Sequence, residues 1–319
     1  MRIDVSEIKT FRTCKRQWQL SSRNRFHLRP IVTPPHFALG TLFHEALAMM
    51  YCGVSLEKIM DMVKREMQPD SDAALLAMIP GYYKNVLPGD LERFKVLDIE
   101  YKFEFVPTDS KGELLFDPVP TETPGEFEHP IIICGSIDLV ALDVEENAIY
   151  GFEHKTTQNF RDESYIWMDE QPRVYTEALK RYVADYNERK RTAWLNAGAP
   201  ADKEPVPATL GGIYLNEVKK LLRQFQYRRT LCKYSDEDQD NFLQAFFVSC
   251  NSVKSFVENN SYAAPNPSYF ACQMCAFKTI CSTYMYENLD KETVLEEFQE
   301  EFQERTEDHL DEKVERHLD

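Results

Sequence analysis

The sequence has 319 residues, of which 43% are apolar and 28% are charged, a composition that excludes collagen-like, low-complexity and wholly disordered chains. The net charge of −16 is unevenly spread, because residues 287–319 hold 14 acidic and 4 basic residues whereas residues 1–30 hold 8 basic and 2 acidic ones. Overall acidity therefore does not exclude a nucleic-acid partner, since local basic patches decide contact with phosphates.

The N-terminal segment and the lengths of the apolar runs indicate the cellular compartment of the protein. Residues 1–9, MRIDVSEIK, carry charges where a signal peptide would be apolar, and no uncharged apolar run approaches the ~20 residues of a membrane helix. We therefore expect a protein without a membrane partner, in the cytoplasm of a prokaryotic cell or of a virus-infected host. The eight cysteines should then stay reduced, so that clustered ones indicate metal ligands.

Helices are predicted first, then a mixture of strands and helices. Helices are expected over residues 6–20, from 40 to near 53, from 55 to 69, over 166–191 and over 236–259, and strands over 98–106, 131–140, 148–156, 209–218 and 221–229. This order predicts the α/β class, with a mixed central sheet flanked by helices. Since no Gly-rich turn follows a strand and no Gly precedes Lys, a Rossmann fold and a P-loop ATPase are excluded.

Two strand segments, GSID at 135–138 and GFEHK at 151–155, hold the central chemical signal. Strand side chains alternate, so Glu153 and Lys155 share a face, and a short hairpin brings Asp138 beside Glu153. Paired carboxylates suit Mg²⁺ or Mn²⁺. A neighbouring Lys can orient or deprotonate a metal-bound water, or neutralise charge on a phosphate, as phosphodiester hydrolysis requires. The alternative is a surface strand on which Glu and Lys merely pair.

Two helices add further candidates. His44 lies in GTLFHEAL on a helix otherwise suited to a core, where it is either a ligand or a satisfied core histidine. Gln171 and Tyr175 are spaced i, i+4 on the helix after the second strand and point the same way. The alternative is that Gln171 and Tyr175 only pack against neighbouring elements.

The motifs GTLFHEAL, GSIDLV, FEHK and QPRVY, in this order over residues 40–175, resemble the RecB-like branch of the PD-(D/E)XK nuclease superfamily. That branch includes the nuclease domains of RecB and AddB and small CRISPR-associated exonucleases. The resemblance implies a restriction-endonuclease-like core in which His44, Asp138 and Glu153 bind a catalytic divalent metal. It also makes the carbonyl of His154 a ligand, and Glu100 a candidate for an acidic position of some relatives.

The same resemblance implies that Lys155 is the catalytic lysine and that Gln171 and Tyr175 position the DNA or the site. The expected function is a metal-dependent DNA nuclease, an exonuclease acting on single strands or on ends of double-stranded DNA in recombination, repair or CRISPR-type processing. The alternative function is a DNA-end-binding or adaptor protein with a residual nuclease site.

A second signal is Cys272-x2-Cys275-x5-Cys281, three cysteines that are one ligand short of a closed metal site. It resembles the iron-sulfur subset of the family, which implies that Cys14 completes a 4Fe–4S cluster joining the N- and C-terminal segments. Lys15 stands where relatives commonly have Pro. A zinc site with the same ligands, or a core role for Cys14, remain alternatives.

Basic residues and the C-terminal segment complete the sequence-based expectations. Candidate phosphate contacts are Arg12, Arg16, Arg223 and Arg228, with a solvated helix face as the alternative. We expect a nuclease domain over 1–286, including an iron-sulfur module of residues 1–30 and 260–286. Residues 287–319 are expected to form a mobile or loosely helical acidic tail that could dock a protein partner.

Overall fold

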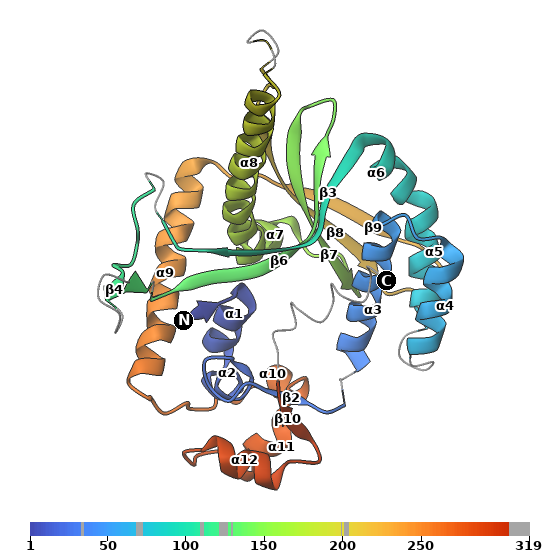
Figure 1. Ribbon diagram of the computed structural model, residues 1–319. Coiled ribbons are helices and arrows are strands. Elements are labelled where there is room, and N and C mark those ends of the chain that lie inside the picture. The colour runs from blue at the N-terminus through green and yellow to red at the C-terminus, as the bar shows by residue number, and fades with distance from the viewer. Residues whose placement is uncertain are drawn as a thin grey trace. The chain divides into compact units, whose positions relative to one another are not determined.

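The computed structural model describes residues 1–32, 35–67, 73–108, 112–120, 127–128, 130–198, 200 and 204–305. The chain divides into two compact units built from segments that are distant in sequence (Figure 1). Residues 35–103 and 136–235 form one unit, called the sheet unit here, and residues 1–34, 104–135 and 236–319 form the other, called the cysteine unit. The predicted nuclease residues belong to the sheet unit, and the four predicted cluster cysteines belong to the cysteine unit.

A mixed β-sheet organises the sheet unit. Its strands are β3 (Phe94–Phe105), β6 (Ile132–Asp143), β7 (Ala148–Thr157), β8 (Thr209–Lys219) and β9 (Tyr227–Cys232). β3 pairs with β6, β6 and β7 are antiparallel, β7 and β8 are parallel, and β8 and β9 are antiparallel. The β3 and β6 strands each extend into the cysteine unit, where β1 (Arg2–Ile3) pairs in parallel with the start of β6. The predicted mixed sheet is therefore confirmed.

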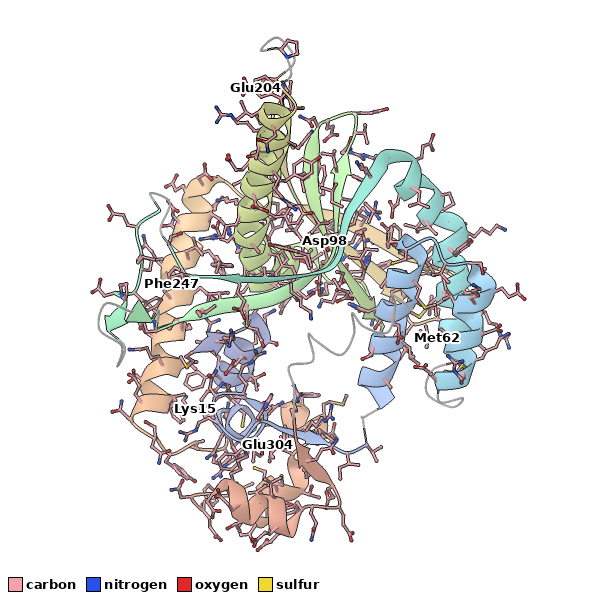
Figure 2. All side chains as sticks on the ribbon, in the orientation of Figure 1. Lys15, Met62, Asp98, Glu204, Phe247 and Glu304 are labelled. Carbon is pink, nitrogen blue, oxygen red and sulfur yellow. The ribbon has the colours of Figure 1, made fainter. Side chains whose placement is uncertain are left out.

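Helices cover both faces of this sheet (Figure 1). They are α3 (Pro35–Tyr51), α4 (Leu56–Glu66), α5 (Leu75–Asn85), α6 (Leu87–Arg93), α7 (Glu163–Met168) and α8 (Glu170–Asn196). Phe152 of β7 shares an apolar core with α3–α6, and that core includes Met62 of α4 (Figure 2). The neighbouring Gly151 points the other way, because a Cβ there would lie 3.7 Å from Leu179 of α8. The helix expected over 166–191 is divided at Asp169, whose side chain accepts from the main-chain N–H of Gln171 and starts α8.

The cysteine unit combines short strands with helices. Its remaining elements are α1 (Val5–Thr13), α2 (Lys15–Ser21), β2 (Leu28–Pro30), β4 (Val119–Pro120), β5 (Phe127–Glu128), α9 (Asp236–Glu258), α10 (Tyr269–Gln273), α11 (Lys278–Thr283), α12 (Lys291–Glu297) and β10 (Phe302–Glu304). The single helix predicted from Ser6 to Leu20 is wrong, because Cys14 is extended (φ −156°, ψ 110°) and separates α1 from α2. Asp4, rather than Ser6, caps α1 by accepting from Glu7 N at 2.8 Å.

The acidic C-terminal segment begins as a packed part of the cysteine unit. Leu289, Val294 and Phe302 are buried in one apolar cluster with Leu20 and Leu28, and β10 pairs antiparallel with β2. The expectation of a mobile tail is therefore wrong for residues 287–305, since their apolar side chains find a core in the N-terminal elements. Residues 306–319 lie outside the described residues. Within the described part of the chain, no helix is both long and apolar enough to cross a membrane.

Candidate active site

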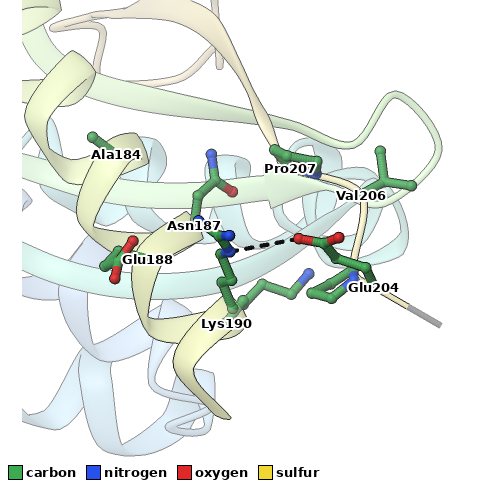
Figure 3. A pocket seen from close by; sticks show the side chains of 9 residues that line it. Ala184, Asn187, Glu188, Lys190, Glu204, Val206 and Pro207 are labelled. Carbon is green, nitrogen blue, oxygen red and sulfur yellow. Dashed lines mark ion pairs between the residues drawn. The ribbon is translucent and has the colours of Figure 1, made fainter. Parts of the chain in front are cut away.

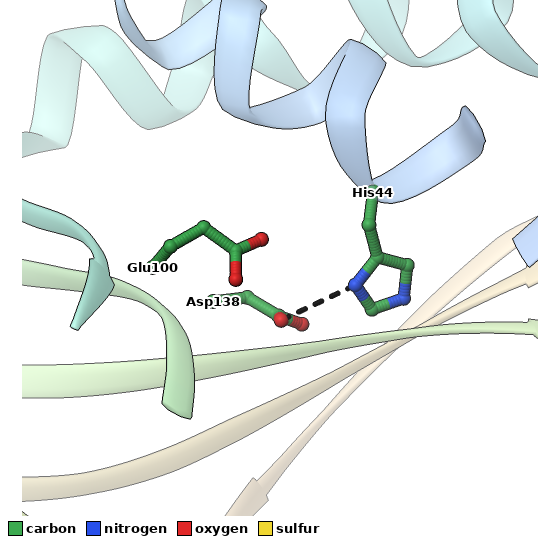
Figure 4. Close-up of side chains that lie close together, drawn as sticks. All are labelled: His44, Glu100 and Asp138. Carbon is green, nitrogen blue, oxygen red and sulfur yellow. Dashed lines mark hydrogen bonds and ion pairs between the residues drawn. The ribbon is translucent and has the colours of Figure 1, made fainter. Parts of the chain in front are cut away.

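Three side chains of types that can bind metal ions converge in the sheet unit: His44 from α3, Glu100 from β3 and Asp138 from β6 (Figure 4). One donor atom of each lies within 4.8 Å of those of the other two. His44 Nδ1 is 3.2 Å from Asp138 Oδ1, while the main-chain N–H of His154 donates to Asp138 Oδ2 at 2.7 Å. One imidazole and two carboxylates form a donor set suited to Mn²⁺ or Mg²⁺. The residues present therefore fit a divalent cation.

Glu100 reaches this group from an unusual backbone conformation. Its φ of 52° lies in the left-handed region, which costs a residue with a Cβ about 1–2 kcal/mol. Ser136 Oγ donates to its carboxylate at 3.5 Å. Strain of this kind persists where the side chain that it positions has a use. Strand alternation could not predict it, because the alternation assumes regular extended backbone.

Glu153 anchors a second chain of contacts on β7. Its carboxylate is 3% exposed, contacts Lys155 Nζ and accepts from Gln171 Nε2 at 2.9 Å. Gln171 Nε2 also lies 2.8 Å from the hydroxyl of Tyr175. The first turns of α8 thus bring both predicted positioning residues to the predicted strand face. Among the described residues, the close three-donor group contains Glu100 and not Glu153.

Burial and neighbouring charges shift the pKa values of Asp138, Glu153 and Lys155. Burial raises the pKa of Asp138, but the charge and hydrogen bond of His44 outweigh it and hold that pKa below its ordinary value. Burial and the charge of Asp138 raise the pKa of Glu153 to about 7, against the opposing charge of Lys155. Burial lowers the pKa of Lys155, yet Glu153 outweighs it and the pKa is raised. Perturbed, charge-paired groups of this kind gather where a reaction develops charge.

The side chain of His154 lies on the opposite face of β7 and is 2% exposed. Its Nδ1 is 3.1 Å from Asn216 Nδ2, and Asn216 Oδ1 accepts from Arg229 Nε at 2.8 Å. Because a guanidinium only donates, the amide oxygen must face Arg229 and the amide nitrogen must face His154. His154 Nδ1 is therefore an acceptor, and burial lowers the pKa of this imidazole to about 4.

Asn216 belongs to a buried polar network behind β7. Arg229 donates to both carboxylate oxygens of Asp90, at 2.6 and 2.8 Å, and Tyr51 donates to Asp90 at 2.6 Å. Tyr82 lies 2.8 Å from Tyr51 and 3.3 Å from Asn216 Nδ2. This network supports the strand whose amide holds Asp138. No sequence motif predicts this network, because its members are scattered between residues 51 and 229.

The four predicted cluster cysteines are all free thiols of the cysteine unit. Main-chain N–H groups donate to two of the sulfurs, Asn266 to Cys14 at 3.5 Å and Ser268 to Cys272 at 3.4 Å. Burial raises the pKa of Cys275, and the charges of Cys14, Cys281 and Cys272 raise it further, so the four thiols lie within electrostatic reach of one another. Within the described residues no three of these sulfurs lie within 4.8 Å of one another.

The predicted DNA-contacting arginines divide into two pairs. Arg16 is 1% exposed and donates to the carbonyl of Glu287 at 2.6 Å, so its prediction as a surface residue is wrong. The break at Cys14 changes the helix phase and turns Arg16 inward. Arg228 is bound to the fully buried Glu217, with Nε 3.0 Å from Oε2. Arg12 and Arg223 are exposed, and Arg12 also donates to Ser249 Oγ.

A pocket in the sheet unit lies apart from these residues (Figure 3). It is formed by the later turns of α8 and residues 204–207, with an Arg191–Glu204 ion pair at 3.5 Å. None of the predicted site residues lines it.

Comparison with known proteins gives one family. The model of the PD-(D/E)XK nuclease superfamily matches residues 2–282. No curated protein matches. A solved structure described as "Crystal structure of SSO0001" is 11% identical, over 91% of this chain and 88% of that chain, with a TM-score of 0.33. That superposition is too loose to support an argument.

Proposed function

The chain belongs to the PD-(D/E)XK nuclease superfamily, and we propose that it is a metal-dependent deoxyribonuclease acting on DNA ends or single strands. The observation that carries the proposal is the convergence of His44, Glu100 and Asp138 beside the Glu153–Lys155 pair. The finer proposal, an exonuclease of the RecB-like branch working in recombination, repair or CRISPR-type processing, draws on the order of the four motifs.

The divalent cation would be held by His44, Glu100 and Asp138, with Glu153 and the carbonyl of His154 as further proposed ligands. When bound, such a cation polarises a phosphoryl oxygen and lowers the pKa of a coordinated water. Lys155 brings a positive charge to the same strand face, where it can stabilise charge developing on the phosphate. Gln171 holds the Glu153 carboxylate, and Tyr175 holds Gln171, so that the Glu153–Lys155 pair keeps one orientation.

Digestion of end-labelled linear DNA and closed circular DNA, with Mg²⁺ and with Mn²⁺, tests this function. We expect linear DNA to be degraded from its ends and closed circles to be spared. Equal cleavage of circles would replace the exonuclease by an endonuclease. Binding of DNA without cleavage under either metal would favour the adaptor alternative.

A matched pair of lysines makes the test specific to the site. Lys155 and Lys180 each contact a buried glutamate and are 36% and 35% exposed. Lys155→Met should lower the cleavage rate by about 10²-fold or more, the scale for removing one preorganised electrostatic group. Lys180→Met removes a comparable ion pair within α8, with Glu177, and should leave cleavage unchanged. Similar rates for the two variants would contradict the role of Lys155.

We further propose that Cys14, Cys272, Cys275 and Cys281 hold a 4Fe–4S cluster. Four free thiols with N–H donors to two sulfurs support it, since hydrogen bonds to sulfur are typical of such centres. A single zinc ion bound by the same four thiolates is the alternative centre.

Elemental analysis of anaerobically purified protein distinguishes the two centres. The cluster predicts about four iron and four acid-labile sulfide per chain, and a single zinc without sulfide would overturn it. Cys272→Ser should bleach the visible absorbance, whereas replacement of the exposed Cys52 should leave it unchanged.

A further inference from the structure

An arginine cluster in the cysteine unit lies outside the proposed nuclease site. Arg29 is in β2, and Arg305 directly follows β10 (Glu304 is labelled in Figure 2). The two strands pair antiparallel with Gln303 opposite Arg29, and Arg305 N donates to the carbonyl of His27 at 2.9 Å. Residues two apart on a strand share a face. Arg305 therefore lies diagonally opposite Arg29. Both are on the face of the two strands opposite to the one from which Leu28 and Phe302 pack into the apolar core.

The guanidinium groups of this cluster have unused buried donors. The Nε atoms of both Arg29 and Arg305 are buried and, within the described residues, have no hydrogen-bond partner. A buried N–H of a charged group that lacks an acceptor is destabilising. The arrangement therefore calls for an acceptor, and an anionic one would serve best.

The charges around Arg305 also favour an anionic ligand. Burial lowers the pKa of Arg305, and the positive charges of Arg29 and Arg23 lower it further, with Asp4 as the opposing acid. Asp4 already caps α1 through Glu7 N, and its other oxygen lies 3.7 Å from Arg23. Among the charges that shift the pKa of Arg305, two guanidinium groups therefore oppose the Asp4 carboxylate, which is already engaged by Glu7 N and Arg23.

We propose that Arg29 and Arg305, with Arg23 beside them, form a binding site for a phosphate group. The guanidinium fork matches two phosphate oxygens at once, and a phosphate has enough oxygens to serve three arginines. Free phosphate and a DNA phosphate share this chemistry. The assignment to DNA, through its backbone or a terminal phosphate, rests on the proposed nuclease function.

Thermal unfolding of the full chain in inorganic phosphate, at constant ionic strength set with chloride, tests the site without DNA or divalent metal. Phosphate should raise the unfolding temperature saturably. Arg29→Gln and Arg305→Gln should each weaken the apparent phosphate affinity at least tenfold. Arg189→Gln, at an exposed ion pair with Asp185, should leave it unchanged. Without phosphate, the two cluster variants should be at least as stable as the parent, because each removes a buried Nε–H that has no partner among the described residues. A large loss of stability there would indicate a structural role and overturn the proposal.

Oligonucleotide binding in EDTA identifies the source of the phosphate. If Arg305→Gln abolishes a preference for 5′-phosphorylated over 5′-hydroxyl strands, the site takes a terminal phosphate. If the substitution weakens the binding of both strands equally, the site takes a backbone phosphate. No stabilisation by phosphate, the same stabilisation in every variant, or binding that appears only when residues 306–319 are removed would each overturn the site. Because neither assay requires cleavage, failure of the nuclease proposal would be seen separately.

Discussion

Glu100 offers a test of the site in which two opposing effects can be separated. Its left-handed backbone makes it the strained member of the three-donor group. Glu100→Gly removes both the carboxylate and the strain, whereas Glu100→Gln removes the charge and keeps the strain. Comparing the two variants therefore reports the backbone contribution, and comparing Glu100→Gln with the parent reports the contribution of the carboxylate charge.

The expected magnitudes follow from the conformation and from linkage. Left-handed strain costs about 1–2 kcal/mol, and Gly within a strand costs roughly 0.5–1 kcal/mol. The midpoints of these ranges differ by about 0.75 kcal/mol, so metal-free Glu100→Gly should be more stable than Glu100→Gln by about that amount. In the parent, Mn²⁺ at 100 times its Kd adds about 2.7 kcal/mol. If the loss of Glu100 weakens Mn²⁺ binding 10- to 100-fold, the same concentration adds only about 1.4 to 0.4 kcal/mol.

Urea unfolding with and without Mn²⁺, followed by calorimetric Mn²⁺ titration, measures both effects. Without metal, the glycine variant should have a larger free energy of unfolding than the glutamine variant. Mn²⁺ should stabilise both variants less than it stabilises the parent. Unchanged Mn²⁺ affinity in both variants would refute Glu100 as a ligand. Equal metal-free stability of the two would refute the strain argument while leaving the ligand assignment intact.

Three further outcomes are expected elsewhere. Asp90→Asn should destabilise the protein by about 3–5 kcal/mol, since it leaves the Arg229 charge buried without its partner; in denaturant melts, Asp90→Leu combined with Arg229→Met should cost clearly less, and an equal cost would contradict the pairing. Gly151→Ala places a Cβ 2.7 Å from Ile213 Cδ1 and 3.3 Å from Ile137 Cγ2. It should cost about 1–3 kcal/mol and reduce cleavage, because Glu153 lies two residues on. Unchanged stability and activity would show that the Ile213 side chain can turn aside. Truncation after residue 286 removes three buried apolar side chains, each worth about 1.5–3 kcal/mol, so calorimetry should show a much lower unfolding temperature, and an unchanged one would restore the view of this segment as a detached tail.

The sequence alone determined the mixed α/β class and most of the strands, because period-2 alternation and β-branched runs are local signals. It also predicted that Glu153 and Lys155 share a strand face and that Gln171 and Tyr175 point together, since both follow from backbone periodicity. The contact between these two pairs, Gln171 to Glu153, needed the packing of α8 on the sheet.

Tertiary structure decided the features that depend on residues distant in sequence. The left-handed backbone at Glu100, the inward turn of Arg16 after the break at Cys14, and the network behind β7 have no local signature. The burial of residues 287–305 likewise depends on N-terminal elements that supply their core. Periodicity reports which side chains of one element share a face, but only packing decides what that face meets, and therefore which charges are buried, paired or left for a ligand.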